Sequence, residues 1–187
     1  MTNELEPQRT SLDPVTIHAD LSEWIIKVTG ETNAIISEFD RPSGSGMSSE
    51  TLLFESTWGE AENEVHKKLV ARLAPTDQDI PVFPNYNLSS QVKVMKLVEQ
   101  LTDIKVPKVL WEEASIDVLG VPFFVMEQVQ GRVPPDIPPY VFGGWLFDAT
   151  PESQLQLQEL CVGIIAQLHQ IKQKSPDTDF LEFHTKG

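Results

Sequence analysis

The chain has 187 residues, with 28 acidic and 14 basic side chains and a formal net charge of −14. Nucleic acids and anionic membranes attract basic surfaces, so this balance argues against both as main partners. A hydrophobic content of 40% supports a packed core and excludes global disorder. No apolar run approaches the roughly 20 residues of a membrane span, and no signal peptide is visible, so we expect a cytoplasmic protein.

The first part of the chain predicts a helix followed by three strands. Residues 1–18 predict a loose tail, and apolar residues spaced three and four apart predict a helix over 19–29. Strands are expected over 34–39, 51–58 and 65–73. Because the turns between them are short, we expect an antiparallel meander.

The rest of the chain predicts a helix, two strands and a final helix. Apolar periodicity indicates a helix over 88–101, and strands are expected over 106–111 and 122–129. Residues 133–150 combine four prolines with interleaved aromatic residues, which predicts a loop packed on the protein. A long amphipathic helix then follows over 151–172.

The final helix has a clear start and one apolar face. Thr150, Pro151 and Glu152 form a favourable N-cap, first position and acidic first turn. Cys161 is the only cysteine, and its place in the apolar pattern predicts a buried, inert thiol. The apolar face is formed by Leu157, Leu160, Cys161, Ile164, Leu168 and Ile171.

Two patterns in the first part indicate anion binding. A turn rich in glycine and serine lets backbone N–H groups approach phosphate oxygens, although it can equally be an ordinary hairpin turn. Arg72, near the end of the third strand, can bind phosphate, with Gln91 on the next helix as a hydrogen-bonding partner. A solvated strand-end charge is the alternative for Arg72. The residues of the turn are Gly44, Ser45, Gly46, Ser48 and Ser49.

The third pattern is residues 123–132, where an apolar run ends in Met126-Glu127 and closes on Gly131. A strand that leaves a buried sheet to become an interdomain hinge has this pattern. An ordinary core strand that exits at Gly131 is the alternative. The order of the three patterns along the chain favours the hinge.

These patterns together resemble the aminoglycoside phosphotransferase family, which shares its fold with choline kinases and, more distantly, protein kinases. The resemblance covers about residues 21–187. It implies an α+β fold, with a protein-kinase-like small lobe over 19–129, built of a five-stranded antiparallel sheet plus a helix. Over 130–187 it implies the hinge exit, a Pro- and aromatic-rich insertion, and the first helix of an incomplete helical large lobe.

The resemblance also implies ATP as cofactor, with Mg²⁺ expected only with the missing large lobe. Met126 would line the back of the adenine pocket. The backbone C=O of Glu127 and N–H of Val129 would meet the adenine edge. Gly44, Ser45, Gly46, Ser48 and Ser49 would cover the phosphates, and Arg72 and Gln91 would complete the nucleotide site.

In this family the catalytic Asp lies in a His-Gly-Asp-type loop, an Asn follows a few residues on, and a metal-binding Asp comes later. None of these occurs in residues 153–187. We therefore expect no catalytic residue in this chain, no activity from it alone, and an apolar surface left exposed on the final helix. A small-molecule hydroxyl substrate is expected, with self-association or a complementing C-terminal half as further partners. A non-catalytic, pseudokinase-like nucleotide-binding module and an unrelated α+β domain are the alternatives.

Overall fold

The computed structural model describes residues 12–40, 50–76, 86–134, 139–171, 178 and 180–181. The chain divides into two compact units, which are described separately. Unit 1 takes Met1–Val92 and Pro107–Gln128, and unit 2 takes Lys93–Val106 and Val129–Gly187. The last passage from unit 1 to unit 2 thus falls between Gln128 and Val129, within the segment predicted as a hinge.

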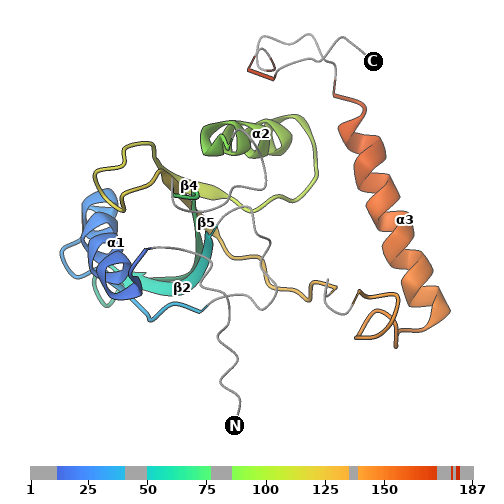
Figure 1. Ribbon diagram of the computed structural model, residues 1–187, viewed down its shortest axis with the longest axis horizontal. Helices are drawn as coiled ribbons and strands as arrows, with labels where there is room; N and C mark the ends of the chain where they lie inside the picture. Colours follow the sequence, from blue (N-terminus) through green and yellow to red (C-terminus); the bar gives the residue numbers. More distant parts are fainter. Residues whose placement is uncertain are drawn as a thin grey trace. The chain divides into compact units, whose positions relative to one another are not determined.

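The protein combines an antiparallel sheet with helices, as the sequence predicts. The described residues form one five-stranded sheet in the order β1-β2-β3-β5-β4, with every neighbouring pair antiparallel. Figure 1 labels β2, β4 and β5 of this sheet. The fifth strand lies between the third and fourth, so β3 and β5 are hydrogen-bonded neighbours. The strands are β1 Ile35–Ile36, β2 Glu50–Trp58, β3 Val65–Leu73, β4 Val109–Glu113 and β5 Phe123–Glu127.

Helices α1 (Pro14–Thr29), α2 (Leu88–Leu101) and α3 (Pro151–Leu168) complete the described secondary structure. Helix α1 begins five residues before the predicted start, so the expectation of a loose tail through residue 18 is wrong. The reason is an N-cap: the Asp13 carboxylate accepts hydrogen bonds from the Thr16 N–H at 3.0 Å and hydroxyl at 2.7 Å. Proline at the first helical position fits this start.

The core of unit 1 lies between α1 and one face of the sheet. Four residues of α1 are buried there, and the Trp24 ring packs against Phe123 at 4.7 Å and Trp111 at 6.3 Å between centroids. The Trp24 indole N–H donates to the Glu113 carboxylate at 3.1 Å, which satisfies its one polar atom. The sheet contributes Leu52, Phe54, Leu69, Ala71, Leu73, Phe123 and Val125 to this core.

Strand alternation fixes which residues lie on the opposite face of the sheet. Since successive side chains point to opposite faces, Val70 and Arg72 of β3 point away from α1. The register pairs Val70 with Met126 and Arg72 with Phe124 on β5, so all four share this face. We call it the open-side face because α1 does not cover it, although Val70 and Phe124 on it are buried, at 6% and 0% exposed.

In unit 2, the segment before α3 is held by local hydrogen bonds and ring contacts. The Trp145 indole N–H donates to the Val133 carbonyl at 3.2 Å, and the Arg132 guanidinium lies over the Trp145 ring at 4.8 Å. The Gln154 amide donates to carbonyls of the preceding turn. Phe142 nevertheless remains 77% exposed, so the predicted packing of this loop holds only for part of its aromatic residues.

Helix α3 begins as predicted, with Thr150 as N-cap accepting from the Ser153 N–H, but none of its residues is buried. The prediction of a buried Cys161 is wrong, because Cys161 is exposed and no neighbouring element covers its side of the helix in the described part of the chain. The exposed apolar surface expected on this helix is confirmed. No helix in the described ranges is long and apolar enough to cross a membrane.

Candidate nucleotide-binding site

The predicted nucleotide residues that the structure describes in unit 1 lie on β3, β5 and the start of α2. The glycine- and serine-rich turn, residues 41–49, lies outside the described residues. Its members Gly44, Ser45, Gly46, Ser48 and Ser49 therefore stay predictions from sequence.

Arg72 stands one residue before the end of β3, and it is half-buried. Its Cα partners are Thr51 on β2 and Phe124 on β5, so the side chain leaves the middle of the sheet on the open-side face. A guanidinium at this position can offer two parallel N–H groups to a phosphate. The position therefore fits a phosphate-binding cation.

An apolar patch adjoins Arg72 on the same face. Val70, two residues earlier on β3, pairs with Leu53 on β2 and with Met126 on β5. Leu53 and Met126 are half-buried, and Val70 is 6% exposed. Sequence reasoning identified Met126 but missed Leu53 and Val70. Alternation along β3 places Val70 on the same face as Arg72, so the sequence alone could have indicated Val70. Leu53 could not be found in this way, because its position beside Val70 depends on the register between β2 and β3.

Successive backbone N–H groups at the end of β5 point alternately to the segments on its two sides. The Glu127 N–H donates to the Lys108 carbonyl at 2.9 Å, and the Gln128 N–H donates to the Lys68 carbonyl at 2.9 Å on the other side. In an extended chain, the C=O of one residue and the N–H two residues later point to the same edge. Because β5 ends at Glu127, this relation between the Glu127 C=O and the Val129 N–H stays a prediction.

Val129 is exposed just beyond this strand, with 68% of its surface accessible. Its N–H has no hydrogen-bond partner among the described residues. The Glu127 side chain, in contrast, is engaged in an ion pair with Lys67. The Glu127 carboxylate is thus directed to β3.

Gln91 lies in the first turns of α2 and is half-buried. The turn is held by Asn87, whose side-chain oxygen accepts from the Ser90 N–H at 2.9 Å and whose carbonyl accepts from the Gln91 N–H at 3.4 Å. The pairing of Gln91 with Arg72 stays a prediction.

Charged side chains continue along β2 and β3, beyond the apolar patch. Glu55 pairs in register with Lys68, accepts from the Lys68 ammonium at 3.2 Å, and lies 3.0 Å from His66 Nε2. The hydrogen bond and charge of Lys68, followed by those of His66, hold the pKa of Glu55 below its ordinary value. The open-side face therefore runs from Arg72, through apolar residues, to an ion-paired end.

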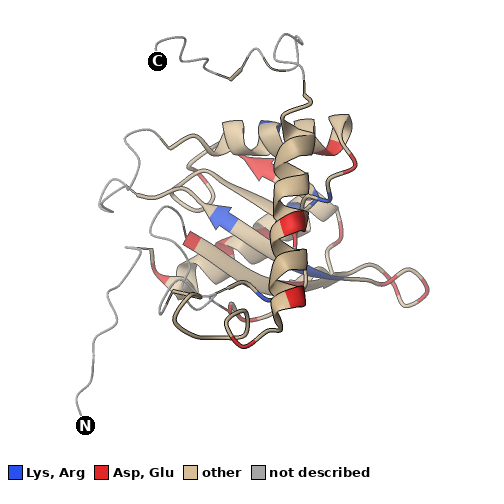
Figure 2. Ribbon diagram, turned by 90° about the vertical axis from the view of Figure 1, so that its right-hand side faces the viewer, with Lys and Arg blue, Asp and Glu red and all other residues tan. Residues whose placement is uncertain are grey.

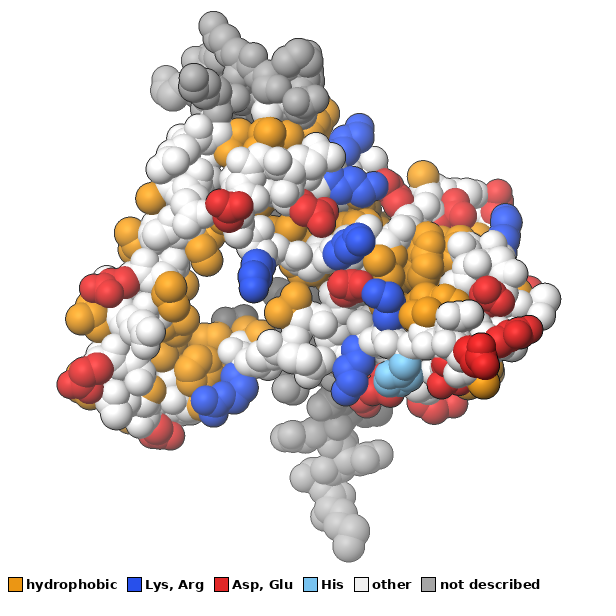
Figure 3. Space-filling view, turned by 180° about the vertical axis from the view of Figure 1, so that it is seen from behind, with side chains coloured by type: hydrophobic (Ala, Val, Ile, Leu, Met, Phe, Trp, Pro, Cys, Tyr) orange, Lys and Arg blue, Asp and Glu red, His pale blue; other side chains and the backbone are white. Residues whose placement is uncertain are grey.

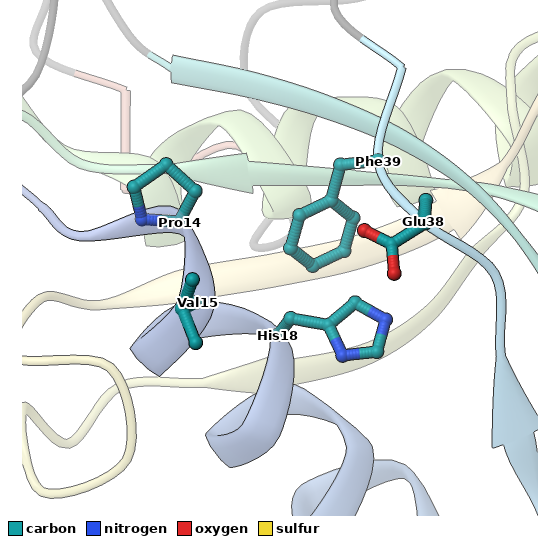
Figure 4. A pocket seen from close by; sticks show the side chains of 5 residues that line it. All are labelled: Pro14, Val15, His18, Glu38 and Phe39. Atoms are coloured by element: carbon teal, nitrogen blue, oxygen red, sulfur yellow. The ribbon is translucent and has the colours of Figure 1, made fainter.

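A hollow of about 430 Å³ lies elsewhere on unit 1, at the start of α1 (Figure 4). The His18 ring packs against Phe39 with centroids 5.3 Å apart, and its Nε2 lies 3.2 Å from the Ser37 carbonyl oxygen. Pro14, Val15 and Glu38 complete the lining. No predicted site residue that the structure describes lines it, so we do not assign the nucleotide to this hollow.

Among the described residues, no three His, Cys, Asp or Glu side chains gather as ligands for a metal ion. No family model matches the sequence. The case for a nucleotide site therefore depends on the geometry of β3 and β5.

Proposed function

We propose that unit 1 binds ATP as the small lobe of a phosphotransferase that moves the γ-phosphoryl group to a hydroxyl of a small molecule. One observation carries this proposal: Val70 joins Arg72 and Met126 on a single face of the sheet. Two residues along a strand span about 7 Å, so the cation and the apolar patch lie close together along β3.

The apolar patch and Arg72, with the backbone at the end of β5, suit the adenine and the phosphates of ATP. The flat adenine packs on the apolar patch of Leu53, Val70 and Met126. The Glu127 carbonyl accepts from the adenine amino group, and the Val129 N–H donates to a ring nitrogen. Arg72 binds phosphate oxygens, and backbone N–H groups of residues 44–49 cover them.

Phosphoryl transfer also needs a carboxylate to accept the hydroxyl proton and oxygen ligands for Mg²⁺. The described residues contain no such ligand set, so no step is assigned to Mg²⁺ here. The catalytic groups and the acceptor site would come from a large lobe or a complementing half. We therefore expect the 187-residue chain alone to bind ATP without turnover. Robust phosphorylation of a substrate by this chain alone would contradict the proposal that the catalytic groups come from another part.

Calorimetric titration with ATP tests the proposal. Arg72→Ala should weaken ATP binding by about tenfold or more, because a charge-assisted contact to phosphate is lost. Lys27→Ala is the matched control: it removes a cation from the last turn of α1, on the covered side of the sheet. Equal affinity of wild type and Arg72→Ala would remove Arg72 from the site, and no ATP binding by any folded form would overturn the proposal.

Gln91 favours a second candidate, a non-catalytic nucleotide-binding or pseudokinase-like module. An amide can hydrogen-bond to Arg72 but supplies no charge to orient it, whereas kinase-like sites use a glutamate there. The gene sequence after the Gly187 codon separates the two. A His-Gly-Asp-type loop followed by a metal-binding Asp supports the phosphotransferase, and their absence supports the module.

A further inference from the structure

The hollow at the start of α1 has the size and lining of a small binding site. Its volume of about 430 Å³ falls within the range of small-molecule pockets, roughly 300–1,000 Å³. Pro14, Val15 and His18 line it from α1, where spacings of three and four residues place all three on one side of the helix. Glu38 and Phe39 line it from the segment after β1, and all five residues belong to unit 1.

A β-bulge brings Glu38 and Phe39 to this hollow together. The Ser37 and Asp40 N–H groups donate, at 2.9 and 2.8 Å, to carbonyls of β2 that are only two residues apart. Glu38 and Phe39 therefore lie opposite the single residue Phe54. Successive side chains of a regular strand point to opposite faces, but a bulge re-aims one of them, so both side chains can line the same hollow.

The polar groups that line the hollow accept hydrogen bonds. His18 Nε2 lies 3.2 Å from the Ser37 carbonyl oxygen, which can only accept, so Nε2 carries the hydrogen and Nδ1 of the neutral ring is an acceptor. The Glu38 carboxylate is exposed and takes part in no hydrogen bond or ion pair among the described residues. None of the described lining residues is a Lys or Arg.

The Phe39 ring stands between a polar and an apolar end of the hollow. In Figure 4 the Glu38 carboxylate lies on one side of this ring, and Pro14 and Val15 lie on the other. A contact with the core residue Phe54, 5.9 Å away between centroids, fixes the ring. The negative face of an aromatic ring attracts a cation, so Phe39 favours the same kind of ligand as the two acceptors.

An anion is the alternative occupant, because the start of a helix attracts negative charge. In α1 this role is already filled by Asp13, whose pKa is held below its ordinary value chiefly by the Thr16 hydroxyl and N–H and also by the Val15 N–H. The Ile17 N–H donates to the Asp13 carbonyl at 3.0 Å, and Pro14 has no N–H. The first turn, residues 14–17, therefore has no N–H left for an external anion.

The charge of the whole chain also favours a cation. The net charge is −14, and acidic residues, red in both views, recur along the ribbon in Figure 2 and over the face drawn in Figure 3. Such a surface raises the local concentration of cations and lowers that of anions. Because this field acts over the whole protein, selective binding in the hollow must depend on Glu38 and His18.

We propose that this hollow binds a small molecule that carries a primary alkylammonium group. The ammonium donates to the Glu38 carboxylate and to His18 Nδ1, and the alkyl chain passes the Phe39 ring toward Pro14 and Val15. A primary ammonium has three N–H groups, so it can serve both acceptors and still donate to water. The hollow lies on the α1 side of the sheet and not on the open-side face, so this proposal does not depend on ATP binding.

Titration of the full chain with n-hexylammonium, followed in ¹H–¹⁵N spectra, tests the proposal. We expect saturable shifts at the amides of residues that line the hollow. Glu38→Gln should raise the dissociation constant by at least about fivefold, because charge-assisted hydrogen bonds are lost. Glu31→Gln is the matched control: it removes the same charge from an exposed position that does not line the hollow, so it should change the constant by less than about twofold.

A second variant serves if Glu38→Gln alters the dispersion of the spectrum. His18→Phe keeps a ring against Phe39 but removes Nδ1, and it should also weaken binding of n-hexylammonium. The absence of saturable shifts near the hollow in the wild type would overturn the proposal, as would equal effects of Glu38→Gln and Glu31→Gln.

Three further ligands test the chemistry of the occupant. Hexanoate has the opposite charge, and n-hexyltrimethylammonium has the charge without an N–H group; both should bind at least about fivefold more weakly than n-hexylammonium. Equal binding of hexanoate would overturn the proposal, and equal binding of the trimethyl form would contradict the two hydrogen bonds. Tighter binding of Nα-acetyl-lysine amide would assign the hollow to a lysine side chain of another protein and contradict a small-molecule occupant.

Discussion

Helices α1 and α3 start in the same way and end in different surroundings. Each begins with a capping side chain followed by proline, Asp13-Pro14 in one and Thr150-Pro151 in the other. Helix α1 buries four residues against the sheet, whereas α3 buries none. Local sequence is therefore sufficient to start a helix, but only a tertiary partner determines whether its apolar side is covered.

The largest expected effect is the loss of stability when a buried side chain of α1 is truncated, compared with an exposed side chain of α3. Leu21→Ala should lower the free energy of unfolding of unit 1 by about 2–5 kcal/mol, because Leu21 is fully buried in α1. Leu155→Ala in α3, where the side chain is exposed, should change the free energy of unfolding by no more than about 0.5 kcal/mol. Urea unfolding followed by tryptophan fluorescence measures both, and similar losses would remove the contrast between the helices.

Substitution of two tryptophans tests the same contrast, with a smaller expected loss of stability. Trp24→Phe should cost about 1.5–3 kcal/mol, since it removes a hydrogen bond from a buried indole to the Glu113 carboxylate. Trp145→Phe should cost less than about 1 kcal/mol, because Trp145 is only half-buried and its hydrogen bond is exposed. Urea titrations give the two values, and a larger loss for Trp145→Phe would reverse the assignment of the stable core to unit 1.

The smallest effect concerns acid stability of unit 1. The pKa of Asp13 is held below its ordinary value of 3.8, chiefly by the Thr16 hydroxyl, and that of Glu55 below 4.5, chiefly by Lys68. Because both folded pKa values are lowered, their contribution is complete above the ordinary values and is lost as pH falls through the folded values. Asp13→Asn with Glu55→Gln should flatten the decline of stability below pH about 4. If the decline of stability at low pH is the same in the double variant and the wild type, these contacts do not contribute to the stability of unit 1.

The secondary structure of this protein could be predicted largely from local signals. Strand β3 was predicted with its observed limits, because alternating side chains end at turn residues on both sides. The start of α1 could have been predicted from Asp13-Pro14, a capping signal that the helical periodicity alone does not include. Exposure of Cys161 could not, because periodicity shows which side of a helix is apolar without showing what covers it.

The candidate site was predictable only in part. Arg72 and Met126 could be chosen from their places at strand ends, but their meeting on one face depends on β5 lying beside β3. That strand order is a tertiary property which no local pattern contains. Leu53 joins the patch only through its register with Val70, and it was missed for the same reason.

Amide hydrogen exchange at the end of β5 tests the proposed ATP site most directly. The Gln128 N–H already donates to the Lys68 carbonyl, so its exchange should not change when ATP is added. The Val129 N–H, which has no partner among the described residues, should exchange more slowly with ATP bound, and Arg72→Ala should reduce this protection. Unchanged exchange at Val129 under saturating ATP would contradict the proposed contact between adenine and this segment.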